Sequence, residues 1–297
     1  MSRLLVGIET GGTKIVCAAA PEGDPRRILT RTSVATGEPD TTLAAVGDFI
    51  RSLDDEIAGV GIAAFGPLDL DQASPTYGSI TSTPKAGWDG VDVLGRIRAA
   101  AAGAPARITT DVTGAALGEL QWGAAQGASD VAYVTVGTGV GAGLIAAGRV
   151  LVGTGWPEIA HLPVARHPDD TFAGICRFHG DCLEGVASGP AVRARNGVDT
   201  QQLDAAARAK SNEITAFYLA QLAATLYFTL GIELIVFGGG VLKTPGLIEA
   251  LQEAAAVRVG PAGARGSSRN LAIARTELDG EAGLYGSLLL AEQAAAG

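Results

Sequence analysis

Four side chains of metal-binding types lie close together in the second half of this 297-residue chain. His161, Cys176, His179 and Cys182 form the pattern H-x14-C-x2-H-x2-C. Two thiolates and two imidazoles satisfy the tetrahedral preference of Zn²⁺, and four protein ligands leave no open position for substrate or water. The pattern therefore predicts a structural zinc site. His167 falls outside the spacing and is expected at the surface.

Three glycine-rich turns each follow an apolar run: GIETGGTK at 7–14, TVGTGVGAG at 135–143 and FGGGV at 237–241. The first departs from a P-loop because Thr13 separates Gly12 from Lys14 and a strand is expected next. The second fits GxGxxA, but a hairpin follows it where a dinucleotide-binding fold requires a helix. A glycine hairpin can still direct backbone N–H groups at a phosphate. Each turn alone is more often structural, and the three together are a stronger indication of a phosphate ligand.

Asp111 stands where a predicted strand ends and a predicted helix begins. From the residues alone, an N-cap is the simpler interpretation. A carboxylate in that place can also act as a general base.

The elements expected around these residues form two similar series, because a strand, a glycine turn and a second strand open both halves. A loop rich in Pro, Gly, Ser and Thr spans Gly66 to Gly90, and loops of that length are usually functional. Strands are predicted at 3–8, 14–20, 59–65, 106–110, 131–136, 144–148 and 232–237, and helices at 41–54, 91–102, 112–125, within 211–230 and from about 281.

Composition limits the function classes. The chain is 47% hydrophobic and 18% charged, which is ordinary for a globular protein. Its formal net charge of -9 argues against a nucleic-acid-binding surface, which needs clustered Lys and Arg. No long uncharged run predicts a membrane span or signal peptide, so we expect a cytoplasmic protein. Three cysteines do not make a disulfide framework.

The order of these motifs resembles the phosphate-1, connecting, phosphate-2 and adenosine motifs of the actin, hexokinase and Hsp70 superfamily. More narrowly, the chain resembles the bacterial ROK kinases, and among them the fructokinases. The stretches that carry this resemblance are AAFGPLDLD, SPTYGSITSTPKAGW, TTDVTGAALGE, PEIAHLPV and FHGDCLEGVASGP.

This resemblance implies an α/β protein with two RNase H-like (actin-like ATPase) domains around a cleft. We expect an N-terminal domain at 1–115, joined by the C-terminal helix 281–297. The C-terminal domain is expected at 116–280 and contains the zinc-binding segment 153–190. A homodimer is also expected.

The resemblance further implies ATP and Mg²⁺, and it makes Asp111 the catalytic base. Glu9 stands where many relatives have Asp and becomes a candidate magnesium ligand, directly or through water; a solvated turn carboxylate is the alternative. The residues expected at the phosphates and the adenosine are Gly11, Gly12, Thr13, Lys14, Thr138, Gly139, Gly239 and Gly240.

For the sugar, the resemblance indicates Glu158, His161 and Glu184. His161 either binds zinc through one ring nitrogen and faces the sugar with the other, or serves the sugar alone. Two departures are evident. Thr110 and Thr113 flank Asp111 where many ROK kinases have Asn, and Ala160 replaces the usual Gly before the histidine.

D-fructose, phosphorylated at its 6-hydroxyl, is the expected substrate. Lys85 stands where many glucose-directed relatives have Asn, and the loop around it matches the fructokinases. An ordinary solvated lysine is the alternative interpretation of this residue. Mannose, glucose and N-acetylmannosamine are the alternative substrates. A non-catalytic sugar sensor or repressor is the other class, but only six residues precede Gly7, too few for a helix-turn-helix.

Overall fold

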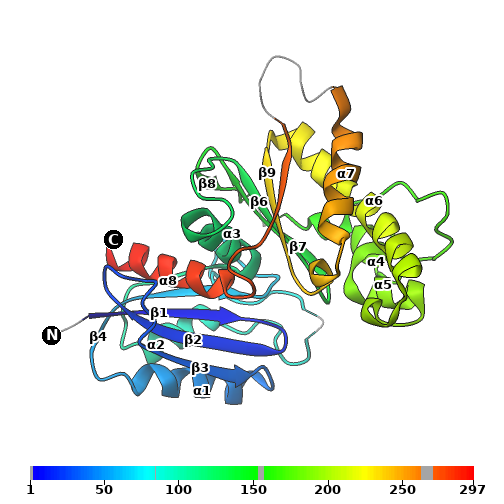
Figure 1. Cartoon of the computed structure of the whole chain (residues 1–297). Helices are drawn as coiled ribbons and strands as arrows, with labels where there is room; N and C mark the ends of the chain where they lie inside the picture. Colours follow the sequence, from blue (N-terminus) through cyan, green and yellow to red (C-terminus); the bar gives the residue numbers. More distant parts are fainter. Residues whose placement is uncertain (1–2, 84, 153–156, 262–269) are drawn as a thin grey trace. The chain divides into compact units, whose positions relative to one another are not determined.

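The computed structural model describes residues 3–83, 85–152, 157–261 and 270–297, which form two α/β units (Figure 1). Unit 1 contains the chain up to Trp122 and again from Glu281 to the C-terminus. Unit 2 contains the described residues between them, except Val152, which belongs to unit 1. The start of the predicted zinc-binding segment, 153–156, lies outside the described residues.

Unit 1 is built on a five-stranded sheet in the order β3-β2-β1-β4-β5. β1, β2 and β3 are antiparallel, as the glycine hairpin between the first two predicts, and β4 and β5 run parallel to β1. The strands are β1 (Arg3–Thr10), β2 (Lys14–Pro21), β3 (Thr30–Ala35), β4 (Glu56–Ala64) and β5 (Ala106–Thr110).

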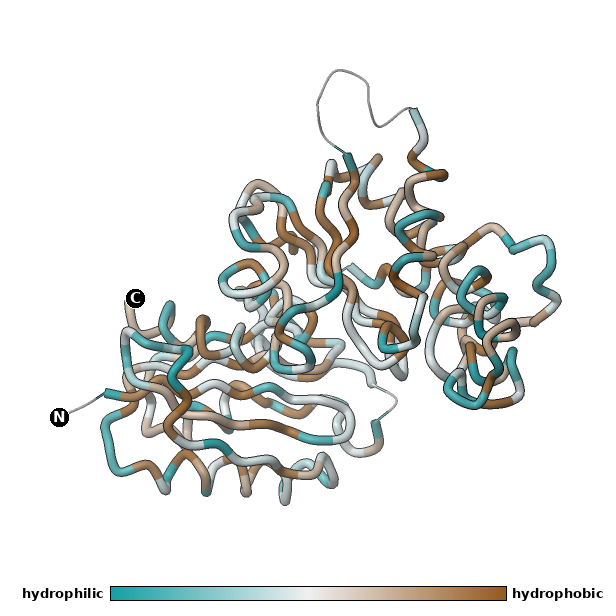
Figure 2. The backbone as a smooth tube through the Cα atoms, in the orientation of Figure 1, coloured by the Kyte–Doolittle hydropathy of each residue, from teal (hydrophilic) through white to brown (hydrophobic). Residues whose placement is uncertain are grey.

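Unit 2 repeats this arrangement with the strand order β10-β9-β6-β7-β8. Read from β8, the order and the strand directions are those of unit 1, which confirms the predicted recurrence of the β-turn-β opening. Figure 2 shows hydrophobic residues along β9 and its neighbours. The strands are β6 (Val131–Val136), β7 (Val140–Ala146), β8 (Arg149–Val150), β9 (Leu234–Gly238) and β10 (Ala272–Arg275).

The helices of unit 1 are α1 (Pro39–Arg51), α2 (Val93–Ala100), α3 (Asp111–Trp122) and α8 (Ala282–Ala295). α8 packs on β1, β4 and α3 and lies on the opposite face of the sheet from α1 (Figure 1). A Cβ atom at Gly61 would lie closer than 3.0 Å to the Ser287 carbonyl oxygen, so glycine lets the helix backbone approach the strand. Leu284, Leu288 and other apolar residues of α8 complete the core on this face.

The helices of unit 2 are α4 (Leu183–Ala187), α5 (Gly189–Asn196), α6 (Ala205–Leu230) and α7 (Leu247–Val259), with short 3₁₀ turns at Ile159–His161 (η1), Thr200–Gln202 and Val241–Lys243. α6 buries Tyr218, Leu219 and Leu222 in the core of this unit. The sequence patterns did not predict β3, α4, α5, α7 or β10, and α6 begins earlier than expected. No helix in the described ranges is long and apolar enough to cross a membrane.

Candidate active site

The glycine hairpin of unit 1 turns its carbonyl groups toward protein donors. The Gly11 carbonyl accepts a hydrogen bond from the Thr36 hydroxyl at 2.7 Å, and the Thr13 carbonyl accepts one from the Thr36 N–H at 2.9 Å. Because C=O and N–H point in opposite directions across a trans peptide, the Gly12 and Lys14 N–H groups of these peptides point away from Thr36. A Cβ atom at Gly12 would meet nothing within 4 Å, so this tip of the hairpin has room for a ligand.

Lys85 reaches the same hairpin from the long loop between β4 and α2. Its Nζ donates a hydrogen bond to the Gly12 carbonyl at 2.8 Å, so this partly exposed lysine has a defined partner in the hairpin. The loop is anchored nearby by Trp88, which is fully buried and donates from Nε1 to the Gly37 carbonyl at 2.9 Å. The loop and the hairpin therefore carry one more positive charge close to Lys14 than the glycine motif alone supplies.

Asp111 is the first residue of α3, but the capping bond of this helix comes from its neighbour. The Thr110 hydroxyl accepts a hydrogen bond from the Thr113 N–H at 3.2 Å and donates one to the Thr113 hydroxyl at 2.8 Å. The Asp111 carboxylate accepts from the N–H of Val112 at 2.8 Å. Thr110 thus supplies the capping bond, to the N–H of Thr113, and the start of the helix does not depend on Asp111 as its N-cap.

Glu9 lies at the end of β1, partly buried and beside Asp111 in unit 1. Its carboxylate packs against Gly283 in the first turn of α8, where any Cβ atom would lie closer than 3.0 Å to it. The pKa of Glu9 is raised to about 7, mainly by burial and then by the charge of Asp111, while Lys14 and Arg31 act in the opposite direction. A cation bound here would relieve the repulsion between the two carboxylates, so the pair fits a magnesium site.

In unit 2 the second glycine turn lies beside Glu184. The Glu184 carboxylate accepts a hydrogen bond from the Val140 N–H at 3.2 Å and lies where a Cβ atom of Gly139 would be. Thr138 is exposed at the tip of the turn. Gly239 has a φ of 90° and lies against the Val136 carbonyl at the end of β6, so the third glycine turn adjoins the second. Gly240 follows it, and a Cβ atom added there would meet nothing within 4 Å.

The predicted metal ligands converge in the same unit. The Nδ1 atom of His161 lies 3.7 Å from the Cys176 sulfur and 3.6 Å from the Cys182 sulfur, and the Nδ1 atom of His179 lies 3.9 Å from the Cys176 sulfur. In tetrahedral zinc coordination a sulfur and a nitrogen ligand are about 3.6 Å apart, given the usual Zn–S and Zn–N lengths. The four donors thus fit one cation, and the Nε2 atom of His161 is left for another partner.

A tight hairpin holds these ligands. Cys176 and Gly180 exchange backbone hydrogen bonds of 2.9 and 2.8 Å, which closes the turn that carries His179. The hairpin packs directly on α4: the Gly180 carbonyl lies so close to Gly185 that a Cβ atom there would collide with it. Burial raises the pKa of the Cys182 thiol to about 11, so a bound cation is what would hold this sulfur as a thiolate.

The remaining predicted sugar ligands lie beside this cluster. Glu158 is exposed at the start of η1, and its carbonyl accepts the His161 N–H at 3.1 Å. η1 packs against α4, which carries Glu184, so the three residues are grouped in unit 2.

The expectation for His167 was wrong, because its side chain is buried against Phe217. His167 lies with Asp169 and Glu213 in a second cluster of possible metal ligands. There, however, the Lys210 Nζ lies 2.5 Å from Asp169 and 3.2 Å from Glu213, and this ammonium group already supplies the positive charge. We therefore assign no metal to this cluster.

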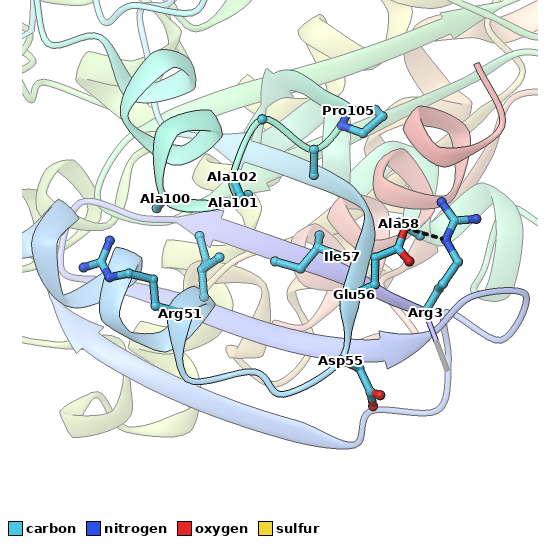
Figure 3. Close-up of a pocket in the computed structure, with 13 residues that line it drawn as sticks. Arg3, Arg51, Asp55, Glu56, Ile57, Ala58, Ala100, Ala101, Ala102 and Pro105 are labelled. Carbon is cyan, nitrogen blue, oxygen red and sulfur yellow. Dashed lines mark ion pairs between the residues drawn. The ribbon is translucent and has the colours of Figure 1, made fainter. Parts of the chain in front are cut away.

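A pocket of about 560 Å³ opens beside Arg3, the first residue of β1, at the end of this strand away from the glycine hairpin (Figure 3). None of the predicted site residues is among those that line it. Its two arginines are exposed and paired, Arg3 with Glu22 at 2.8 Å and with Glu56 at 3.4 Å, and Arg51 with Asp48 at 2.7 Å. Both arginines of the pocket are thus paired with carboxylates, and we assign the pocket no catalytic role.

Comparisons with known proteins agree with this arrangement. A sequence model of the ROK family matches residues 5–294. The chain is 40% identical to the fructokinase of Zymomonas mobilis over 96% of its own length and 95% of the relative's. It is 39% identical to the fructokinase of Lactococcus lactis, with 85% and 84% covered. A ROK family glucokinase from Streptomyces griseus, solved with glucose and AMPPNP, is 25% identical with a TM-score of 0.74 over 98% of this chain and 99% of that one.

The raised pKa of Glu9 predicts a pH-dependent stability. The Glu9 carboxyl group binds its proton more tightly in the folded protein, with a pKa of about 7, than in the unfolded chain, with a pKa of 4.5. Its contribution to stability is therefore complete below pH 4.5 and is lost as the pH rises through 7. The loss is at most about 3 kcal/mol, because each pKa unit corresponds to about 1.4 kcal/mol. Glu9→Gln should remove this decline and be more stable than the wild type at pH 8.

Thermal melts between pH 5 and 8, without Mg²⁺ or nucleotide, measure the effect. Glu56→Gln is the matched control, since Glu56 is exposed at the start of β4 and its removal should leave the decline intact. Parallel pH profiles for Glu9→Gln and the wild type would contradict the interpretation.

Proposed function

This chain belongs to the ROK family, and from that premise we propose that it is an ATP-dependent fructokinase that phosphorylates D-fructose at the 6-hydroxyl group. The observation that carries the proposal is the match to curated fructokinases over nearly the whole chain. Fructose as the substrate rests on those relatives and on the Lys85 loop, since the side-chain types alone do not select a ring form.

Asp111 is the proposed catalytic base. The attacking sugar hydroxyl loses its proton as the phosphoryl group is transferred, and a carboxylate that is held in place can accept it. The Thr110 cap supports this role, because it fixes the start of α3 without the Asp111 side chain as the cap. The capped helix thus holds its first residue in a defined position.

The glycine turns are the proposed phosphate and adenosine contacts. The Gly11–Lys14 hairpin would receive phosphate oxygens through N–H groups, with Lys14 and Lys85 as nearby cations. Thr138 and Gly139 are assigned to the phosphates as well, and Gly239 and Gly240 to the adenosine. ATP brings Mg²⁺, for which Glu9 is the proposed carboxylate, directly or through water; the ion would neutralise charge on the transferred group.

For the sugar we propose Glu158, His161 and Glu184, whose carboxylates and imidazole can each bond neighbouring hydroxyl groups. We also propose that the His161, Cys176, His179 and Cys182 cluster binds zinc with a structural role. His161 would then connect the two, with Nδ1 on the metal and Nε2 toward the sugar.

Other hexoses are the second candidate substrates, because a glucokinase of the same family shares this fold. A non-catalytic sensor is disfavoured by the retained Asp111 and glycine turns. A kinase that consumes ATP acts where ATP is available, so we place it in the cytoplasm, and we keep the homodimer as a proposal from the family resemblance.

A panel of hexoses tests the function. With ATP and Mg²⁺, D-fructose should give the highest kcat/KM, mannose should be second, and the product should be fructose 6-phosphate in a coupled isomerase assay. Sites that bond substrate hydroxyls discriminate by up to ~10⁴-fold when an analogue leaves polar groups unpaired. A tenfold preference for glucose or N-acetylmannosamine would overturn the fructokinase assignment and leave only the broader sugar kinase.

Asp111→Asn tests the base. It should lose roughly 10²-fold or more in kcat while the KM values for sugar and ATP change little, as expected when only a proton acceptor is removed. Asp48→Asn, at an exposed site on α1, is the control and should keep full activity. Near-normal turnover of Asp111→Asn would return this residue to a structural role.

Metal analysis tests the cluster. The purified protein should contain about one zinc ion per chain, since four donors complete one tetrahedral site. Cys176→Ser should lower both the zinc content and the melting temperature, because metal binding contributes to folding. Cys17→Ala, in the buried core of unit 1, should keep its zinc. A zinc-free protein with full activity and unchanged stability would rule the metal out.

A further inference from the structure

Unit 2 contains a buried group of charged residues that the proposed function does not use. The side chains of Asp170 and Arg195 are only 2% and 7% exposed, and Tyr218 beside them is fully buried. Arg166 completes the group at 3.6 Å from the Asp170 carboxylate. We call these four residues the Asp170 network.

The Asp170 carboxylate is the centre of the network. It accepts hydrogen bonds from the Tyr218 hydroxyl at 2.7 Å, from the Phe172 N–H at 3.1 Å and from Arg195 Nε, which lies 3.2 Å from both oxygens. Both guanidinium groups also lie over the Tyr218 ring, with their central carbons 5.5 and 5.7 Å from its centroid. These contacts define a single arrangement of the four side chains.

Stability alone does not account for such a network. Two guanidinium groups face the Asp170 carboxylate, and Arg166 Nη1 also lies 3.8 Å from the exposed carboxylate of Asp181. The Nη1 atoms of Arg166 and Arg195 are nevertheless buried without a hydrogen bond in the described part of the chain. Desolvation of such groups costs several kcal/mol per ion, so a buried ion pair often stabilises no more than apolar side chains of the same size. Because the charged side chains of the network stabilise the fold so little, we look for their role in fixing the positions of the segments that they bond.

The network connects the segment between the metal ligands to the helices. Asp170 lies in the irregular stretch between His161 and Cys176, Arg195 is on α5 and Tyr218 is on α6. The second terminal nitrogen of Arg195 donates to the Val186 carbonyl in α4. Arg195 therefore bonds the irregular stretch and α4 at the same time.

α4 needs this support. It has five residues, and its N-cap, Cys182, makes no side-chain capping bond. A helix of that length is not stable by itself, so its position depends on tertiary contacts. α4 carries Glu184 and directly follows a metal ligand, and it packs against both α5 and α6 (Figure 1).

We propose that Arg195 and Asp170 are positioning residues for the sugar site, which fix α4 so that the Glu184 carboxylate is held toward the hexose. The role of Glu184 in this statement rests on the proposed function. The metal cluster fixes the N-terminal end of α4 through Cys182, and Arg195 fixes the last turn through Val186. These attachments add to backbone hydrogen bonds from Ile175 to Gly185 at 3.0 Å and from Gly189 to Gly137 at 2.7 Å, so loss of Arg195 loosens the last turn of α4 without detaching it.

Arg195→Met tests the proposal, because Met keeps much of the side-chain length and removes the charge and the bonds. The KM for the hexose that the wild type phosphorylates best should rise about tenfold, with kcat and the KM for ATP within about threefold, as for a loss of ground-state sugar binding. The zinc content should stay at the wild-type value. Arg193→Met is the control, since Arg193 is on the same helix, 66% exposed, and paired with Asp199.

Hydrogen exchange of residues 183–188 gives a readout that needs no substrate. The Val186 and Ser188 amides donate to Cys182 and Glu184 within α4, and both should exchange faster in Arg195→Met than in the wild type or in Arg193→Met. If the wild type phosphorylates no hexose, the proposed function fails, and the exchange rates alone decide the positioning role.

Three results would overturn the proposal: an unchanged hexose KM in folded Arg195→Met, unchanged exchange in α4, or loss of zinc together with sugar binding, which would make the effect one of the metal cluster. If Arg195→Met does not fold, Asp170→Asn decides in its place. It keeps the shape of the side chain, removes the ion pair and should raise the hexose KM in the same direction.

Discussion

The close backbone packing of α8 determines the geometry of unit 1. Glycines remove the side chains that would separate this helix from its neighbours: Gly61 on β4 beneath it, and Gly286 on α8 itself, where a Cβ atom would collide with the Gly114 carbonyl of α3. The end of β1 and the start of α3 are both held by this helix. Glu9 and Asp111 consequently lie close enough for one charge to shift the pKa of the other.

Unit 2 is held together differently, because its segment from residue 157 to 182 has almost no regular secondary structure. Backbone hydrogen bonds and a large apolar core are the usual means of fixing a chain, and this segment has little of either. The hairpin of Cys176 and Gly180, the four metal-ligand side chains and the Asp170 carboxylate replace them. Each uses directional bonds, so the segment can be well defined without contributing much to the core.

Local patterns predicted what depends on local physics. The strand–glycine–strand openings and the spacing of Cys176, His179 and Cys182 are encoded over a few residues and were visible in the sequence. The bond from Lys85 to Gly12 spans 73 positions, and the one from Tyr218 to Asp170 spans 48, so no periodicity or spacing announces them. His167 was misplaced for the same reason: its burial depends on Phe217, and nothing in its own neighbourhood indicates that contact. The Thr110 cap was also missed, although a threonine three residues before Thr113 is a recognisable cap signal.

The place of α8 in the chain has a consequence for the order in which the protein is made. Unit 1 begins with the first strand but takes its last helix from residues 281–297. Domains fold largely as the chain emerges from the ribosome, N-terminal parts first. Here the glycine-lined face of β4 stays uncovered until residues 281–297 have been synthesised, after the whole stretch that builds unit 2. Unit 2 is therefore completed before unit 1. A truncation that removes only α8 would leave unit 1 without its last helix.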